Sequence, residues 1–400
     1  MRRATPTCST PLGRRSSFDV GALSPHMPST TRVQYDLARI QTFFPALAAL
    51  GNRFAAERPW EGLTIGLNMH LTTLTATLVR ELMLGGGRFV IAAANPATTD
   101  GAVVEYLRDL GVEVHTGAGR SDAQSPVVAA NPDLVGDVGF ALGEALLRAN
   151  VSPRHGLVEI TGSGVDRLRA RKSLPFPVLN INDGKLKTAI ESRHGVGEGL
   201  WQAYTALTGQ HLAGRRVRVI GYGRVGAGVA AYAKAGGAVV EVVDTDPVRQ
   251  LIARFDGHVP VEPDAVTRPQ VVVTASGKAG ALTLANMGKL PEDAVVMNAG
   301  HGPEEIDVAA LADEATEVDH IGPRVVRYRH PAGGHVVVLG HGSPLNIVMN
   351  AGSNEPVLLH FTLLALGLRW LREAPRSAGE NKLPPHLEAE VARLWLPGAR

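Results

Sequence analysis

Cysteine is almost absent from this sequence of 400 residues, and the only one, Cys8, lies in a leader rich in Arg, Ser and Pro. A single cysteine cannot form an intrachain disulfide, and a thiol nucleophile in such a leader is disfavoured, which suggests a cytoplasmic setting. Residues 1–32 also lack apolar periodicity, so we expect them to be disordered. From 35 to 54 the apolar positions recur at helical spacing and predict a first helix.

An excess of charge of either sign is missing as well. Lys and Arg number 40 against 38 Asp and Glu, a formal net charge of +2, so we expect no nucleic-acid or membrane surface. The longest apolar run, 356–371, contains His360 and Arg369 and is shorter than a membrane span. It predicts a buried helix. We single out no metal-ligating cluster.

The most informative stretch that is present is 214–246, which reads as strand, glycine-rich turn, helix and strand. In such a turn Gly221 permits a tight reversal, Gly223 lets the backbone approach a pyrophosphate, and Gly226 allows close helix packing. Asp244 ends the next strand, where a carboxylate can accept ribose hydroxyls. No Arg adjoins it, so NAD is favoured over NADP. The predicted cofactor contacts here are Gly221, Gly223, Arg224, Val225, Gly226 and Asp244.

Short apolar runs alternate with helix-length segments on both sides of this unit. The runs before it are 63–67, 88–93, 112–115, 126–129, 156–160 and 177–181, and those after it are 270–273, 294–297 and 335–339. This alternation predicts an α/β fold of two doubly wound, Rossmann-like parallel-sheet lobes with a cleft between them. Ligands of such sheets bind beyond the carboxyl ends of the strands, where His70 and His301 are expected.

Several motifs together resemble the S-adenosylhomocysteine hydrolase family over about 35–396. They include Asn180-Ile181-Asn182-Asp183 followed by Lys187, the glycine-rich turn, Met297-Asn298-Ala299-Gly300-His301, and Leu345-Asn346 with Gly352. The resemblance implies a substrate-binding domain over 33–196, an NAD-binding domain over 197–350, a helix at 351–375 returning to the first domain, and a tail over 376–400. It also suggests a homo-oligomer.

The resemblance implies roles for individual residues. Lys187 matches the lysine that deprotonates a sugar 3′-hydroxyl during hydride transfer, Glu191 is its expected partner, and His70 and His301 match histidines beside the 5′ position. The further cofactor contacts implied are Thr161, Ser163, Ser192, Thr274, Ala275, Ser276, Asn298, Ala299, Gly300 and Asn346. The nucleoside contacts implied are His70, Thr72, Asn95, Thr99, Asp133, Glu159, Lys187, Glu191, His341 and Ser353.

The departures from the family pattern fall mainly on the substrate side. Where the family has glutamates, this sequence has Leu74 and Ile160, and Ser353 stands in place of a histidine. The Lys/Tyr-containing tail of the family is also missing. We therefore favour a dehydratase that oxidises C3′ of an adenosine-like nucleoside, eliminates water across C4′–C5′ and reduces the ketone again. The alternatives are hydrolysis of S-adenosylhomocysteine and a non-catalytic NAD-binding relative.

Overall fold

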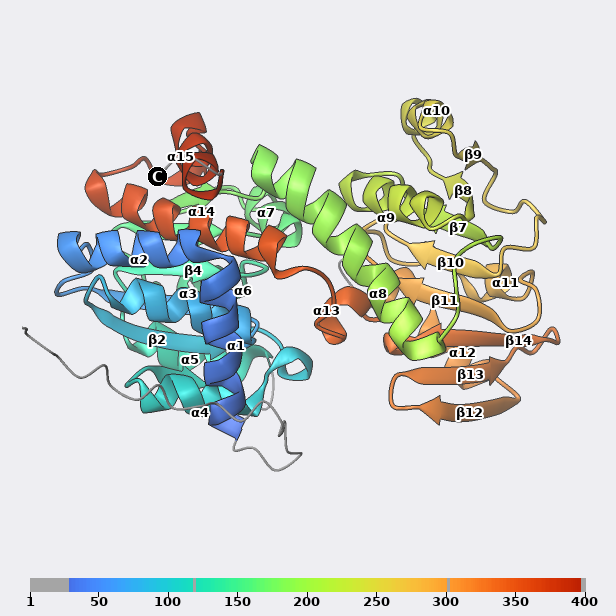
Figure 1. The fold of residues 1–400 in the computed structure, drawn as a ribbon, viewed down its shortest axis with the longest axis horizontal. Helices are drawn as coiled ribbons and strands as arrows, with labels where there is room; N and C mark the ends of the chain where they lie inside the picture. The colour runs from blue at the N-terminus through green and yellow to red at the C-terminus, as the bar shows by residue number, and fades with distance from the viewer. Residues whose placement is uncertain (1–28, 118–119, 301–302, 397–400) are drawn as a thin grey trace, which may run out of the picture.

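The computed structural model describes residues 29–117, 120–300 and 303–396, which form two α/β lobes joined by helices (Figure 1). The first sheet has the order β15-β6-β5-β4-β1-β2-β3 and is parallel throughout. Its strands are β1 (Thr64–Met69), β2 (Arg88–Ala93), β3 (Glu113–His115), β4 (Leu134–Asp137), β5 (Gly156–Glu159), β6 (Pro177–Asn180) and β15 (Gly379–Lys382). The predicted fold class is confirmed.

Helices cover both faces of the first sheet. They are α1 (Ser29–Phe43), α2 (Pro45–Glu57), α3 (Thr73–Met83), η1 (Pro96–Thr98), α4 (Gly101–Asp109), α5 (Arg120–Ala129), α6 (Ala141–Arg148), α7 (Gly162–Arg169), α14 (Asn354–Glu373) and α15 (Pro385–Trp395). The apolar run at 356–371 is the buried centre of α14, as predicted, with Leu363 and Leu364 fully buried. None of the helices in the described ranges is long and apolar enough to cross a membrane.

The second sheet has the order β12-β13-β14-β11-β10-β7-β8-β9. Its strands are β7 (Arg216–Ile220), β8 (Val239–Val243), β9 (Val259–Pro260), β10 (Val271–Thr274), β11 (Ala294–Asn298), β12 (Glu317–Gly322), β13 (Val325–Arg329) and β14 (His335–Leu339). The sheet is mixed, because β13 pairs antiparallel with both β12 and β14. The sequence did not reveal this hairpin.

The remaining helices belong to the second lobe or lie between the lobes. They are η2 (Leu186–Gly195), α8 (Val196–Thr208), α9 (Arg224–Ala235), α10 (Pro247–Phe255), α11 (Leu284–Met287), η3 (Pro303–Glu305), α12 (Val308–Glu314), η4 (Gly340–Gly342) and α13 (Leu345–Val348). In Figure 1, α8 runs diagonally across the junction, beside the segment that leads from α13 into α14. The chain therefore crosses between the lobes once before the NAD turn and once after β14.

Four expectations about the elements were wrong. The run at 126–129 is the end of helix α5, and the strand that follows is β4 at 134–137. The expected helix at 35–54 is broken at Phe44, because a residue before proline is disfavoured in α-helical conformation and Pro45 follows. Helix α1 begins at Ser29, inside the segment expected to be disordered. The expected tail over 376–400 is not a separate segment: β15 extends the first sheet, and α15 packs against α14 and α2 and contributes Leu387 and Val391 to the core.

Candidate functional site

A cavity of about 210 Å³ lies where the carboxyl ends of the first sheet meet the segments that link the lobes. Residues that follow β1, β4 and β5 form one wall, η2 forms a second, and the α13–α14 segment closes it. Five predicted substrate residues line this cavity, His70, Thr72, Lys187, Glu191 and Ser353, together with Thr161 and Asn346 of the predicted cofactor set. The fold thus brings together side chains that are up to 283 positions apart in the sequence, from His70 to Ser353.

Lys187 and Glu191 form an ion pair inside the π-helix η2, with Lys187 Nζ 2.5 Å from Glu191 Oε2. The Ser192 hydroxyl donates to the same carboxylate oxygen at 3.3 Å, so Ser192 supports the pair. Burial would raise the pKa of Glu191, but the charge of Lys187 and the hydrogen bonds from Lys187 and Ser192 lower the pKa below its usual value. π-Helical turns are rare and often occur at functional sites. This carboxylate therefore stays ionised beside the lysine.

His70 follows β1, and its Nδ1 lies 2.7 Å from Thr98 Oγ1. The Thr98 hydroxyl donates to the Asn95 carbonyl oxygen at 3.0 Å, so its oxygen accepts from Nδ1–H of His70. Nδ1 is therefore the protonated nitrogen of the neutral ring, and Nε2 is the nitrogen that gains or loses the second proton. The neighbouring Thr99, which was expected to contact the nucleoside, also donates its hydroxyl to the Asn95 carbonyl oxygen.

Two expected substrate contacts do not face the cavity. Asp133 precedes β4, at the amino edge of the sheet, where its carboxylate accepts the Thr64 N–H at 2.9 Å. The Glu159 carboxylate is fully buried and accepts from the backbone N–H groups of Gly139, Phe140 and Thr161 and from the Thr161 hydroxyl. Its contacts fix the loop that carries Thr161, whose hydroxyl is held 2.6 Å from Glu159. Both positions were wrong as direct contacts.

A buried acidic pair lies behind this wall. Asp137 and Glu159 are partners in neighbouring strands and are completely buried. Burial raises the pKa of Asp137 to about 6, against hydrogen bonds from Gly143 and Asn68. Burial and the Asp137 carboxylate together raise the pKa of Glu159 to about 8. The pair holds a proton at neutral pH. This partnership depends on strand register and leaves no pattern in the sequence.

Asn95, His341 and Ser353 also belong to the expected substrate set, and their contacts differ. The Asn95 side chain accepts from Ala97 N–H at 2.9 Å and starts η1. His341 is exposed, with Nε2 3.4 Å from the Pro323 carbonyl, and does not line the cavity. Ser353 begins α14, and its N–H donates to Glu198 at 3.3 Å. His301 lies outside the described residues.

The glycine-rich turn in the second lobe has the shape that a dinucleotide requires. Gly221 has a φ of 97°, and a Cβ there would lie 2.7 Å from the Ala275 carbonyl oxygen. A Cβ at Gly226 would overlap the Gly221 carbonyl, whereas a Cβ at Gly223 would meet only Arg249, at 3.8 Å. Gly223 therefore leaves room for phosphates to approach the backbone at the start of α9. Val225 is half-buried in the first turn of that helix and packs on its core.

Asp244 is held in place by two backbone groups, accepting from Tyr222 N–H at 2.6 Å and from Asp246 N–H at 2.9 Å. One expectation was wrong here: α10 brings Arg249 to within 3.7 Å of Asp244. Arg249 also lies 3.6 Å from Asp246, so two carboxylates offset this single cation. The local charge still disfavours a 2′-phosphate.

The other predicted cofactor residues form the loops after β10 and β11. Thr274 donates to Asn298 at 3.0 Å, Asn298 accepts from Gly300 N–H at 2.7 Å, and the Ala299 N–H donates to the Thr274 carbonyl. Ser276 is bound by Glu305. The Asn346 side-chain oxygen is buried and has no partner among the described residues. An acceptor in that state suits the carboxamide of a nicotinamide, so the residues present fit NAD.

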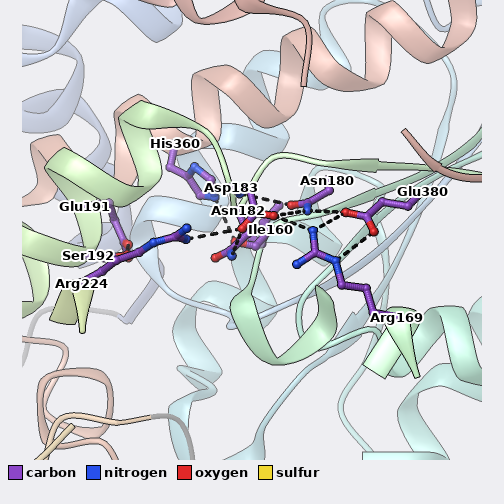
Figure 2. Close-up of polar contacts among 10 residues, drawn as sticks. All are labelled: Ile160, Arg169, Asn180, Asn182, Asp183, Glu191, Ser192, Arg224, His360 and Glu380. Carbon is purple, nitrogen blue, oxygen red and sulfur yellow. Dashed lines mark hydrogen bonds and ion pairs between the residues drawn. The ribbon is translucent and has the colours of Figure 1, made fainter. Parts of the chain in front are cut away.

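Charged side chains also link the two lobes. Figure 2 shows Asp183 between Arg224, at 3.4 Å, and Arg169, at 2.7 Å. Arg169 continues to Glu380 of β15 at 2.6 Å. Although burial opposes it, Arg169 lowers the pKa of Asp183. Arg224 therefore points away from the Gly223 backbone and toward the first lobe. Ser163, expected at the cofactor, lies 3.5 Å from the Thr161 hydroxyl.

Comparison with known proteins agrees with this geometry. Residues 192–352 match the model of the NAD-binding domain of S-adenosyl-L-homocysteine hydrolase. The S-inosyl-L-homocysteine hydrolase of Methanopyrus kandleri is 32% identical over 88% of this chain and 87% of its own length. The adenosylhomocysteinases of Pyrobaculum aerophilum and Thermotoga maritima are each 32% identical, over 88% and 89% of this chain and 88% and 92% of their own lengths.

The chain belongs to the S-adenosyl-L-homocysteine hydrolase family. NAD is the cofactor, as the glycine-rich turn predicted. Within this adenosylhomocysteinase-like chain, the sequence interpretation missed Thr98, Asp137 and His360. A histidine in an otherwise apolar helix is usually structural, and only the fold reveals that His360 lines the cavity.

Proposed function

We propose that this adenosylhomocysteinase relative is an NAD-dependent nucleoside dehydratase, which removes water across C4′–C5′ of an adenosine-like nucleoside. NAD, when bound, takes the hydride from C3′ and returns it at the end of the cycle. The resulting 3′-ketone acidifies the neighbouring C4′–H, so that a 5′ substituent can leave. The product is one water lighter than the substrate.

The observation that carries this proposal is the charge of the cavity wall. Among the described lining residues, only Lys187 and Glu191 are charged, and they pair with each other at 2.5 Å. Homocysteine carries both an ammonium and a carboxylate, and enclosing such groups without partners is costly. Leu74 and Ile160, which stand where the family has glutamates, add apolar surface to the same wall. This lining favours a substrate whose leaving group is a neutral hydroxyl.

In this proposal the chain's own residues move the protons. Lys187 Nζ takes the proton of the 3′-hydroxyl while it passes one of its own protons to Glu191, so the ion pair as a whole gains one proton. His70 holds Nδ1–H against Thr98, so its Nε2 can take the proton from C4′ and give it to the departing 5′-oxygen, which leaves as water. The apolar wall limits access of other water to the reacting carbons.

The second candidate is hydrolysis of a homocysteine thioether, which the names of the relatives favour. Purified protein should be incubated separately with S-adenosylhomocysteine, adenosine and a keto-hexose nucleoside, with mass spectrometry and a thiol assay as readouts. Loss of one water from a nucleoside without thiol release supports the dehydratase. Release of homocysteine at a comparable rate would instead identify a hydrolase, and no turnover of any of the three would favour a non-catalytic relative.

A further inference from the structure

His360 of α14 is a buried histidine in the cavity wall. One of its ring nitrogens makes a hydrogen bond, and the other makes none among the described residues. Its Nε2–H donates to the Ile160 carbonyl oxygen at 3.1 Å (Figure 2). Its Nδ1 is buried and has no hydrogen-bond partner among the described residues. His360 lines the same cavity as Lys187 and Glu191. The ring therefore has a single buried hydrogen-bonding atom without a partner among the described residues.

That atom is an acceptor. Burial, together with the charge of Lys187, lowers the pKa of His360 to about 4, although Glu191 and the Ile160 carbonyl oppose the shift. The ring is therefore neutral near pH 7, and its one proton is held on Nε2 by the Ile160 carbonyl. Nδ1 keeps its lone pair and can only accept a hydrogen bond.

An unpaired buried acceptor destabilises a fold, so its presence calls for a partner. The neighbours of His360 along α14 are apolar, with Leu358 and Leu363 fully buried, and supply none. Ile160, at the carboxyl end of β5, offers only its carbonyl oxygen to the ring, and that oxygen is bound to Nε2.

We propose that His360 Nδ1 accepts a hydrogen bond from a sugar hydroxyl of the bound nucleoside, the one adjacent to the hydroxyl that Lys187 deprotonates. This assignment rests on the proposed function, because it takes Lys187 to mark the 3′ position. Helix α14, which carries His360, packs against η2, which carries Lys187 and Glu191, and all three side chains line the cavity. His360 is then a binding residue that selects ribonucleosides over 2′-deoxyribonucleosides.

Two substitutions test the roles of Nδ1 and Nε2 of His360 separately. In His360→Asn, the side-chain oxygen falls near the position of Nδ1 and keeps the acceptor but loses the Nε2 donor. In His360→Gln, the amide reaches the position of Nε2 and keeps the bond to Ile160, but the acceptor is lost. His330, which is buried and satisfied far from the cavity through Leu284 and Ala332, provides the control His330→Gln.

The NAD-loaded protein and its variants should be titrated calorimetrically with adenosine and 2′-deoxyadenosine. We expect the parent, His330→Gln and His360→Asn to prefer adenosine by about 10–100-fold, the usual effect of leaving a built acceptor unpaired. In His360→Gln the preference should fall to within about threefold. Thermal unfolding of each variant checks folding, and His360→Leu, which suits the apolar surroundings, repeats the test should His360→Gln not fold.

Full discrimination in a folded His360→Gln or His360→Leu variant overturns the proposal, and so does a parent that binds neither nucleoside or both equally. The proposed function is read separately, from NADH absorbance after mixing the parent with adenosine. A parent that discriminates through His360 without forming NADH would keep this inference and refute the function. NADH formation with unchanged discrimination in the variants would support the proposed function and refute this inference.

Discussion

At the scale of single residues, Lys187 and His70, the two residues proposed to transfer protons, differ in the groups that hold them in place. Lys187 is held by a carboxylate within its own helix, whereas His70 is held by the hydroxyl of Thr98 in the neighbouring η1. The first arrangement stabilises an ammonium, and the second fixes which imidazole nitrogen can exchange its proton. The two residues should therefore fail at different steps when they are replaced.

We expect Lys187→Ala to abolish reduction of bound NAD, because hydride cannot leave C3′ while the hydroxyl proton stays. His70→Ala should leave this first oxidation intact and slow product formation by about 10²–10⁴-fold, the usual contribution of a general acid. Rapid mixing with substrate, followed by NADH absorbance, distinguishes the two. Parent-like NADH formation in Lys187→Ala would remove the lysine from the mechanism, and undiminished turnover in His70→Ala would remove the histidine.

The buried pair Asp137 and Glu159 predicts an unusual pH dependence of stability. The folded pKa of Glu159 is raised to about 8, whereas an unfolded glutamate titrates near about 4.3. Its contribution to stability is therefore complete below the unfolded value and is lost as pH rises through about 8. We expect the melting temperature of the parent to fall more between pH 6 and 9 than that of Glu159→Gln. Parallel melting curves across this range would contradict a proton shared by the pair.

At the scale of elements, the helices and strands that could be predicted are those specified by a local sequence pattern. The strand, turn, helix and strand expected in 214–246 are β7, α9 and β8 with the glycines at the turn. The run at 126–129 could not be assigned in the same way, because four apolar residues fit a strand or a buried helical face equally. The antiparallel β12–β13 pair carries exposed and buried residues without clean alternation, so it left no signal.

The candidate site likewise divides into residues in local sequence motifs and residues brought together only by the fold. Lys187 and the glycine-rich turn lie in contiguous motifs, so the sequence alone was enough to find them. His360, Thr98 and Asp137 acquire their positions only when α14 crosses the strand ends and when β4 and β5 align. Asp133 was misplaced for the converse reason: four residues along a strand separate the amino edge of a sheet from its carboxyl edge.

The contact between α9 and η2 offers a test at this scale. A Cβ at Gly228 of α9 would overlap the Arg193 carbonyl oxygen of η2, so the two helices approach as closely as glycine allows. Gly228→Ala should separate them and cost about 1–3 kcal/mol of stability. NAD binding should weaken as well, because α9 carries the phosphate-binding turn. Gly101→Ala, where a Cβ would meet nothing within 4 Å, should unfold like the parent. Equal stability of both variants would contradict a tight contact between α9 and η2 at Gly228.

At the scale of the whole molecule, the lobes are joined by small residues and by exposed charges. Gly199 of α8 would place a Cβ 2.5 Å from the Ala351 carbonyl oxygen, and Gly352 lies against the same helix. The Arg224–Asp183 pair is about half exposed on its arginine side, and such pairs contribute little to stability. Close backbone packing at the α8 junction, rather than surface charge, therefore sets how the NAD turn faces the cavity.

The path of the C-terminal segment gives the last prediction. Strand β15 pairs with β6, and α15 buries Leu387 and Val391 in the core of its own lobe, so the described C-terminal elements cover their own substrate domain. If the protein forms the homo-oligomer that we expect, these elements do not complete a neighbour's cofactor site. The rate of NAD release should therefore be unchanged when the protein is diluted until light scattering reports dissociation. Faster release from the dissociated form would mean that a neighbouring subunit covers the NAD site, and light scattering that reports a monomer at every concentration would refute the expected oligomer itself.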